Sequence, residues 1–169
     1  TMALTEPQAG SSLSDITTTA VPQADGTFLI KGQKIFISGG DHEATENFVH
    51  LTLARIEGAP TGTKGISLFV VPKYLENETG STYNNVETAG DFQKLGQRGY
   101  STVHLVFGEQ GPTKGFLVGE PNKGLSYMFQ MMNGARIDVG MTAASTATAA
   151  YYHSLQYAKE RPQGRKINQ

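Results

Sequence analysis

The first twelve residues, TMALTEPQAGSS, place turn-forming residues among hydroxyl side chains that could bind an anion. Pro7 fixes its own backbone φ angle, and Gly10 permits a sharp reversal or the close approach of a ligand. In a loop of this shape, successive N–H groups and the hydroxyls of Thr5, Ser11 and Ser12 can converge on an anion without any lysine. The other interpretation is a β-turn whose polar groups bond only to one another.

A second candidate is the segment QKIFIS, in which Phe36 and Ser38 are two residues apart. Side chains alternate along a strand, so both would lie on one face, just before the flexible pair Gly39 and Gly40. An aromatic ring beside a hydroxyl suits a flat heteroaromatic ligand, because the ring gives contact area and the alcohol can orient a ring nitrogen. A core phenylalanine beside a strand serine is the structural alternative.

Basic residues in the last third of the chain could also contact a ligand. Arg136 lies in the apolar stripe of a predicted helix, where a guanidinium needs either an ion pair between helices or a ligand carbonyl or phosphate. A basic cluster near the end of the chain is either a solvated helix end or a phosphate contact across a subunit boundary. This cluster consists of Lys159, Arg161, Arg165 and Lys166.

Metal and catalytic-triad chemistry are not indicated by the sequence. The chain has no cysteine, which excludes disulfides, thiolate nucleophiles and cysteine-ligated zinc. The four histidines lack close metal-ligand spacing and join no local Ser–His–Asp set. These histidines are His42, His50, His104 and His153.

The composition excludes several broad classes of protein. A formal net charge of −1 gives no overall field to attract nucleic acid or an anionic membrane. No apolar run approaches the roughly 20 residues of a membrane helix, and no secretory signal pattern starts the chain. We therefore expect a protein with no membrane span and no nucleic-acid partner, with the cytoplasm as its default location.

Up to about residue 119, short β-rich runs alternate with turn signals, a pattern typical of an antiparallel sandwich or barrel. Asp25-Gly26 is a strong hairpin signal between two of these runs. The polar segment 72–90 is expected to be a surface excursion outside the core. The expected strands cover residues 16–21, 27–31, 33–38, 48–56, 65–71 and 102–107.

After Pro121 the apolar residues recur every three or four positions, which predicts one long helix over about 123–160. At 1.5 Å per residue this helix would be roughly 55 Å long and would need other helices to cover it. Residues 140–150 are nearly all small, which permits a close helix neighbour in a soluble bundle. The sequence predicts a mainly β domain, then one long α-helix of a truncated bundle, in a piece of a longer protein.

Four segments occur in a fixed order along the chain: 4–11 (LTEPQAGS), 32–40 (GQKIFISGG), 94–99 (KLGQRG) and 119–136, which leads into the predicted helix. In this order they resemble the signatures of the acyl-CoA dehydrogenase family, and the resemblance covers essentially the whole chain. It implies that residues 1–118 are the family's middle β domain and that 119–169 begin its C-terminal helical domain, with the N-terminal helical domain absent. The stretches ALTEPQAGSSLSDI and FISGGDHE are similar to the subgroup that includes methylmercaptopropionyl-CoA dehydrogenases.

The resemblance implies FAD as the cofactor. Leu4 and Thr5 would offer backbone and hydroxyl hydrogen bonds to the pyrimidine end of FAD. Ser11 would bind the FAD pyrophosphate and contribute to the acyl-CoA site. Phe36 would pack against the flavin ring, and the Ser38 hydroxyl would lie near flavin N5, where hydride arrives. Hydroxyls and main-chain amides would thus take the place of positive charge.

The resemblance also assigns two arginines. Arg136 would lie near the acyl-CoA, and Arg161 would reach the FAD of a neighbouring subunit in a homodimer or homotetramer. Where the family commonly has R-x-x-F-G, this chain reads RPQGR, and the missing phenylalanine weakens the assignment of Arg161. Pro162 is expected to end or kink the helix at this point.

The family's reaction is the α,β-dehydrogenation of an acyl-CoA thioester, with hydride transfer to flavin N5 and reoxidation by electron-transferring flavoprotein. The catalytic glutamate lies downstream in most members and directly before the helix arginine in others, where this chain has Ala135. Glu6 is expected to be structural. We therefore expect no catalytic residue in the chain and no activity from the chain alone. An acyl-CoA oxidase and a nucleic-acid-binding relative of the same fold are the alternatives.

Overall fold

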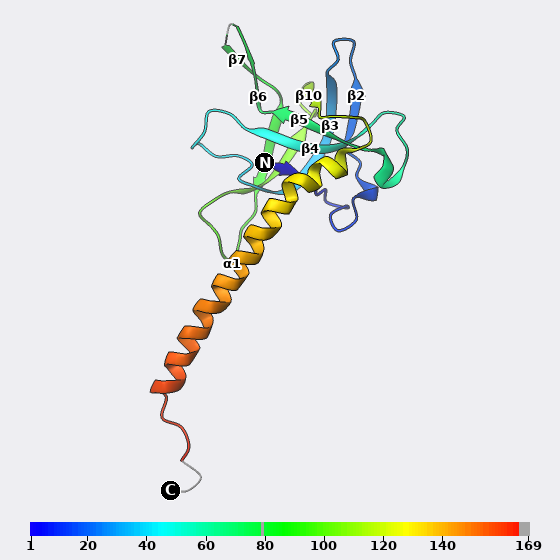
Figure 1. Ribbon diagram of the computed structural model, residues 1–169. Coiled ribbons are helices and arrows are strands. Elements are labelled where there is room, and N and C mark those ends of the chain that lie inside the picture. Colours follow the sequence, from blue (N-terminus) through cyan, green and yellow to red (C-terminus); the bar gives the residue numbers. More distant parts are fainter. Residues whose placement is uncertain (79, 166–169) are drawn as a thin grey trace. The chain divides into compact units, whose positions relative to one another are not determined.

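The structure, a computed structural model, describes residues 1–78 and 80–165 (Figure 1). It divides into two compact units, Thr1–Met128 and a second unit that begins at Phe129. The first unit holds all the described strands together with the start of the long helix α1 (Gly124–Glu160). The opening loop and the segment QKIFIS therefore belong to the first unit, and Arg136 and Arg161 belong to the second.

The first unit is a β-barrel, in agreement with the prediction. The ring closes because β2 pairs with both β3 and β4, in the order β4, β5, β10, β3, β2; strands β9 and β8 extend it from β3. The strands are β1 (Met2–Ala3), β2 (Thr19–Pro22), β3 (Phe28–Ser38), β4 (Val49–Ile56), β5 (Ile66–Pro72), β6 (Tyr74–Asn77), β7 (Gly80–Tyr83), β8 (Val86–Asp91), β9 (Thr102–Phe107) and β10 (Thr113–Leu117); the 3-10 helices are η1 (Leu13–Asp15) and η2 (Gly62–Gly65).

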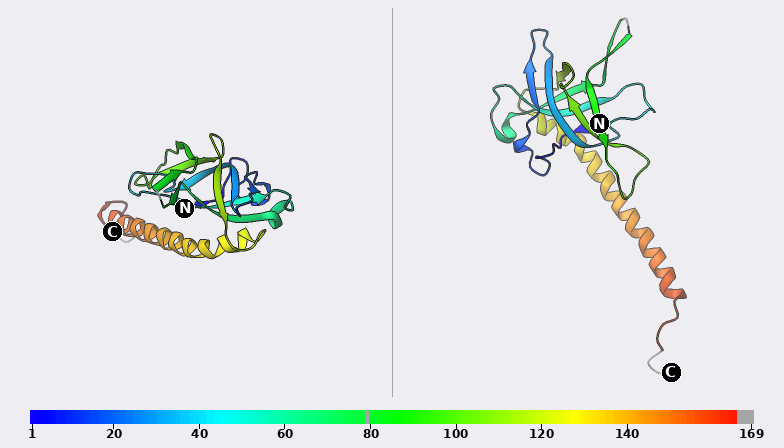
Figure 2. Two further views of the ribbon diagram at one scale, coloured as in Figure 1. Left: turned by 90° about the horizontal axis from the view of Figure 1, so that it is seen from above. Right: turned by 180° about the vertical axis from the view of Figure 1, so that it is seen from behind.

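The hairpin expected at Asp25-Gly26 joins β2 to β3, and Figure 2 shows the two strands running out from the barrel together. Gly26 has a φ of 80°, which the turn requires and which glycine adopts without steric cost. The two strands expected at 27–31 and 33–38 are one continuous strand, β3, of 11 residues. The sheet is mainly antiparallel, but β1 and β2 each pair with β4 in parallel, which differs from the expected antiparallel arrangement.

The prediction that residues 72–90 lie outside the core was wrong for β8. Val86, at the start of β8, is fully buried, and the strand pairs with β9. Asn84, which follows β7, is buried as well. Strands β6 and β7 form a hairpin that projects from the barrel (Figure 2). Strand β10, which pairs with both β3 and β5, was not predicted.

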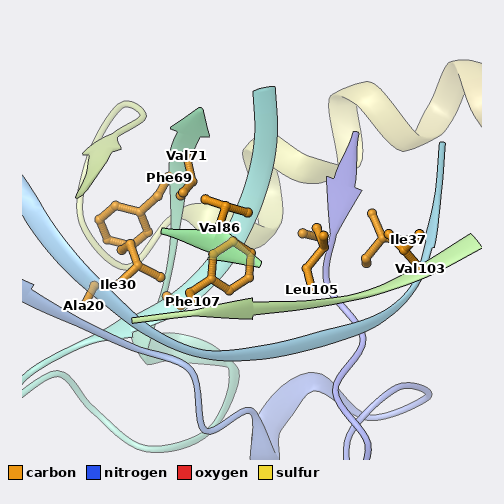
Figure 3. Packing of buried hydrophobic residues seen from close by; sticks show 11 residues of the cluster. Ala20, Ile30, Ile37, Phe69, Val71, Val86, Val103, Leu105 and Phe107 are labelled. Atoms are coloured by element: carbon orange, nitrogen blue, oxygen red, sulfur yellow. The ribbon is translucent and has the colours of Figure 1, made fainter. Parts of the chain in front are cut away.

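The core of the barrel is built from apolar side chains of seven different strands (Figure 3). Phe69 packs edge-on against Phe28 with ring centroids 5.1 Å apart. Burying each such side chain contributes about 1.5–3 kcal/mol, so this cluster supplies the rigidity on which the loops depend. Its members are Ala3, Ala20, Ile30, Ile37, Ala54, Phe69, Val71, Val86, Val103, Leu105 and Phe107.

A buried amide joins the hairpin to the barrel. The Asn84 side chain donates to the carbonyls of Pro72 (2.7 Å) and Lys114 (2.8 Å) and accepts from the Lys114 N–H (2.8 Å). Because Asn84 is only 1% exposed, water cannot replace these bonds when the amide is removed.

Replacing Asn84 with alanine is therefore expected to lower the free energy of unfolding by about 2 kcal/mol, since buried backbone groups lose their partners. Urea denaturation followed by circular dichroism measures the loss. Gln93→Ala is the control, because Gln93 is exposed and makes no side-chain hydrogen bond within the described residues. Equal stability of the two variants would contradict a structural role for Asn84.

Helix α1 begins one residue later than expected and ends at Glu160, two residues before Pro162, as the sequence predicted. Three hydroxyls in its small-residue segment donate to carbonyls one turn earlier: Thr142 to Asp138 (2.9 Å), Thr146 to Thr142 (2.9 Å) and Thr148 to Ala144 (2.8 Å). These polar groups are thus satisfied within the helix. Among the described residues, no helix combines the length and apolar character needed to cross a membrane.

Candidate functional site

The opening loop is fixed by its own backbone and by β3. Glu6 and Ala9 exchange hydrogen bonds, Glu6 N–H to Ala9 O (2.8 Å) and Ala9 N–H to Glu6 O (3.1 Å). The Ile35 N–H donates to the Thr5 carbonyl at 2.8 Å. A Cβ on Gly10 would lie 3.0 Å from the Thr5 methyl group, so the glycine lets the loop fold closely over Thr5.

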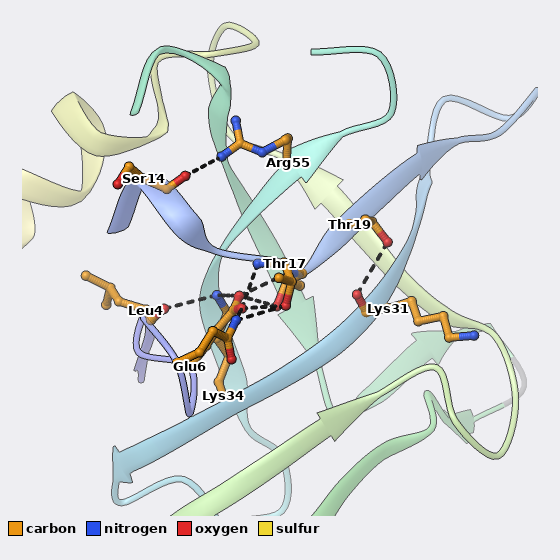
Figure 4. A network of polar contacts seen from close by, with 10 residues as sticks. Leu4, Glu6, Ser14, Thr17, Thr19, Lys31, Lys34 and Arg55 are labelled. Atoms are coloured by element: carbon orange, nitrogen blue, oxygen red, sulfur yellow. Dashed lines mark hydrogen bonds and ion pairs between the residues drawn. The ribbon is translucent and has the colours of Figure 1, made fainter. Parts of the chain in front are cut away.

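A buried ion pair lies directly beneath this loop (Figure 4). The Lys34 ammonium, 0% exposed, is 2.8 Å from a Glu6 carboxylate oxygen and donates to the Leu4 carbonyl at 3.0 Å. Glu6 also accepts from the N–H and hydroxyl of both Thr17 and Thr18, at 2.6–3.1 Å. A buried charge pair of this kind is tolerated because almost every lone pair has a donor.

The pair changes the acidity of both groups. Burial alone would raise the pKa of Glu6, but the Lys34 charge and the threonine hydrogen bonds outweigh it and lower the pKa to about 2. Burial lowers the pKa of Lys34, because attraction to Glu6 offsets only part of the loss of water. Glu6 is therefore an anion fixed to the scaffold, in agreement with the structural role expected for it.

A bulge in β3 presents Phe36 to solvent. The register between β3 and β9 shifts between Lys34 and Ile37, and Phe36 has a φ of 59°, which is unusual for a bulky side chain. As a result the ring is 56% exposed and packs against Phe92 with ring centroids 4.6 Å apart. Strained backbone of this kind often marks a functional position.

The loop and the bulge together line a depression of about 410 Å³. Thr5, Ser11 and Phe36, three of the residues singled out in the sequence, lie in it. Within residues 1–78 and 80–165, the hydroxyls of Thr5 and Ser11 have no hydrogen-bond partner, whereas the Ser12 hydroxyl bonds to Ser14 at 2.7 Å. The depression can therefore offer two hydroxyls and an aromatic ring to a ligand that has both polar groups and a flat ring.

Leu4 and Ser38, the other two residues of the first unit that were predicted to contact FAD, do not line this depression. The Leu4 carbonyl already accepts from Lys34. Ser38 is exposed at the end of β3, in register with Thr102, and is followed by Gly39. A separate depression of about 510 Å³ lies around the Asp41–Lys73 ion pair and includes none of the predicted residues.

The two arginines of the second unit contact only their own helix within the described residues. Arg136 donates to the Asn133 side chain at 3.1 Å and lies 5.3 Å from the Phe129 ring. Arg161 follows the last helical residue, and its backbone N–H donates to Tyr157 at 2.8 Å. Lys166 of the predicted basic cluster lies outside the described residues.

Sequence reasoning missed two residues of this region. Lys34 was not recognised as the partner of Glu6, although a charged residue on the inward face of an apolar strand is a signal for a buried pair. Phe92 was not considered at all, because it lies in an irregular segment between β8 and β9. The described residues contain no group of three or more histidine, aspartate or glutamate side chains placed to hold a metal ion.

Known proteins are similar to this chain over essentially its whole length. Residues 1–109 match the middle domain of acyl-CoA dehydrogenases, and residues 122–169 match the C-terminal domain. The chain is 50% identical to 3-methylmercaptopropionyl-CoA dehydrogenase of Ruegeria pomeroyi over 99% of its length, and 47% identical to a broad-specificity linear acyl-CoA dehydrogenase of Mycobacterium tuberculosis over 100%. In each case the chain spans 28% of the relative's length.

The fold is also shared with solved structures. The crystal structure of an acyl-CoA dehydrogenase from Bacillus anthracis, complexed with FAD, aligns with 98% of this chain and 25% of its own. The TM-score of that alignment is 0.73, and the sequence identity is 30%. With matching domain signatures over both parts of the sequence and the same barrel, the chain belongs to the acyl-CoA dehydrogenase family.

Proposed function

We propose that this chain is the flavin-side and part of the acyl-CoA-binding portion of an FAD-dependent acyl-CoA dehydrogenase, which introduces an α,β double bond into acyl-CoA thioesters. The observation that carries the proposal is the depression lined by an exposed aromatic ring and by two hydroxyls that have no partner among the described residues. We also propose that the β domain ends at residue 118 and that residues 119–169 begin the helical domain. Reoxidation by electron-transferring flavoprotein and assembly as a homodimer or homotetramer are parts of the same proposal.

The residues of the depression fit a dinucleotide that carries both charge and a flat ring. Ser11 would donate its hydroxyl to the pyrophosphate, and Thr5 would hydrogen-bond the pyrimidine edge together with the backbone of Leu4. Phe36 would cover one face of the ring system, and the Ser38 hydroxyl would orient the ring edge where hydride arrives. Bound FAD would supply the hydride acceptor, and the chain would supply alignment and dipoles.

No carboxylate in the depression is suited to remove the α proton. Glu6 is held as an anion by Lys34 and four threonine donors, and Asp15, which also lines the depression, is exposed to solvent. Position 135, the site of the base in some members of the family, is alanine. Arg136 and Arg161 are proposed as contacts to acyl-CoA and to the FAD of a neighbouring subunit.

The test is the anaerobic addition of acyl-CoA thioesters to the FAD-loaded full-length protein that carries this chain. The yellow absorption of the oxidised flavin is expected to disappear as an equal amount of enoyl-CoA forms. Residues 1–169 alone, loaded with FAD, serve as the control and are expected to remain yellow. A full-length protein that is colourless, or whose flavin stays oxidised with short, medium and long thioesters, would contradict the proposal.

A further inference from the structure

The exposed Phe36 ring has one ring neighbour among the described residues. Phe92 lies against it at 4.6 Å between centroids, with the two ring planes tilted by 42°. Phe36 itself lines the depression, but Phe92 does not. The two rings come from positions 56 residues apart in the sequence, so their contact is set by the fold and not by local chain geometry.

Phe92 is attached firmly to the barrel although the segment 92–101 leaves the sheet. Its N–H donates to the Thr102 carbonyl at 2.8 Å, and the side chain of the preceding Asp91 accepts the Thr102 N–H at 2.9 Å. Thr102 is the register partner of Ser38 on β3. Phe92 is thus fixed to the strand position directly opposite Ser38, two residues beyond Phe36.

The fixed position of Phe92 matters for Phe36, because the Phe36 ring is exposed on a bulge and is not held by core side chains. A half-exposed aromatic side chain keeps several rotamers, and ordering it on ligand binding costs entropy. A tilted contact with a second ring favours one orientation over the others. Phe92 is not a member of the barrel core, so its ring can serve this contact without carrying the stability of the fold.

We propose that Phe92 is a positioning residue, which holds the Phe36 ring in the orientation that receives the flavin ring. The inference rests on the proposed function for its ligand and on the ring contact for its geometry. Although Phe92 does not line the depression, its replacement is expected to change the affinity for FAD and the visible absorption of the bound flavin.

The test uses the full-length protein labelled with 4-fluorophenylalanine, in wild-type form and as Phe92→Ala and Phe92→Tyr. The Phe36 fluorine resonance, assigned by its loss in Phe36→Leu, is expected to move toward the solvent-exposed value in Phe92→Ala and to stay in place in Phe92→Tyr. FAD affinity is expected to fall about two- to tenfold in Phe92→Ala, the loss that corresponds to one aromatic pair, and the visible band of the flavin to shift. In Phe92→Tyr, both the FAD affinity and the visible band of the flavin should stay close to those of the wild type.

Phe116→Ala is the matched control, because Phe116 is also exposed and lies in neither the ring pair nor the depression. It should change neither the Phe36 resonance nor FAD binding. An unchanged Phe36 resonance in Phe92→Ala, or unchanged flavin binding and spectrum, overturns the inference while leaving the proposed function intact. A wild-type protein that binds no FAD overturns the proposed function instead, and with it the flavin part of the inference.

Discussion

Replacing Glu6 with glutamine is expected to lower the free energy of unfolding by about 3–5 kcal/mol, because the Lys34 ammonium is left buried without its counter-charge. Both side chains are 0% exposed, so water cannot solvate the remaining charge. The glutamine NH₂ group would in addition face donors of Thr17 or Thr18 where the carboxylate accepted them. Urea denaturation at neutral pH measures the difference.

Glu76→Gln provides the control for this substitution, because Glu76 is exposed on strand β6. That variant should match the wild type within about 0.5 kcal/mol. A Glu6→Gln variant that loses less than about 1 kcal/mol would show that the buried pair does not hold the opening loop to β3.

The same pair gives the stability of the wild type a defined pH dependence. The pKa of Glu6 is about 2 in the folded protein and 4.5 without the fold, so the unfolded chain binds the proton first as the pH falls. The stability that the carboxylate contributes is therefore complete above about pH 4.5 and is lost as the pH falls toward 2. The stability gap between the wild type and Glu6→Gln is expected to narrow over this interval.

Replacing Thr5 with valine and Ser11 with alanine together is expected to weaken FAD binding about 30- to 1,000-fold. This loss of affinity corresponds to about 2–4 kcal/mol of binding free energy. That is the contribution expected from one hydrogen bond to a neutral group and one to a charged pyrophosphate. Valine keeps the methyl group that packs against Gly10, so the loop should keep its shape. Titration of the apoprotein with FAD, followed by flavin fluorescence, gives the affinities.

The control for this pair lies in the same loop. Ser12 also lines the depression, but its hydroxyl is already bonded to Ser14 at 2.7 Å. Ser12→Ala should therefore bind FAD within about threefold of the wild type. If Ser12→Ala were as weak as the double variant, the loss would reflect general damage to the loop and not the two free hydroxyls.

Features with a local cause were predictable from the sequence. Asp25-Gly26 marks its hairpin because the turn needs a glycine with a positive φ, and α1 stops just before Pro162, which lacks the N–H and clashes with the preceding turn. Strand β8 was missed because its sequence, VETAGD, buries only Val86 and leaves no alternating apolar pattern.

Features that depend on distant contacts were not predictable. The alternation rule placed Phe36 and Ser38 on one face, and both are exposed, but the bulge before Ile37 puts only Phe36 in the depression. The local sequence does not predict this bulge, because the bulge depends on how β3 pairs with the distant strand β9. Likewise the partner of Lys34 lies 28 residues away, and only the closed barrel brings the two together.

A crystal structure of the FAD-loaded protein would show directly whether the opening loop and Phe36 hold the cofactor. The Thr5 and Ser11 hydroxyl oxygens are expected to lie within about 3.2 Å of polar atoms of the dinucleotide, and the Phe36 ring is expected to cover its flavin. A dinucleotide bound elsewhere, with both hydroxyls facing water, would contradict this expectation.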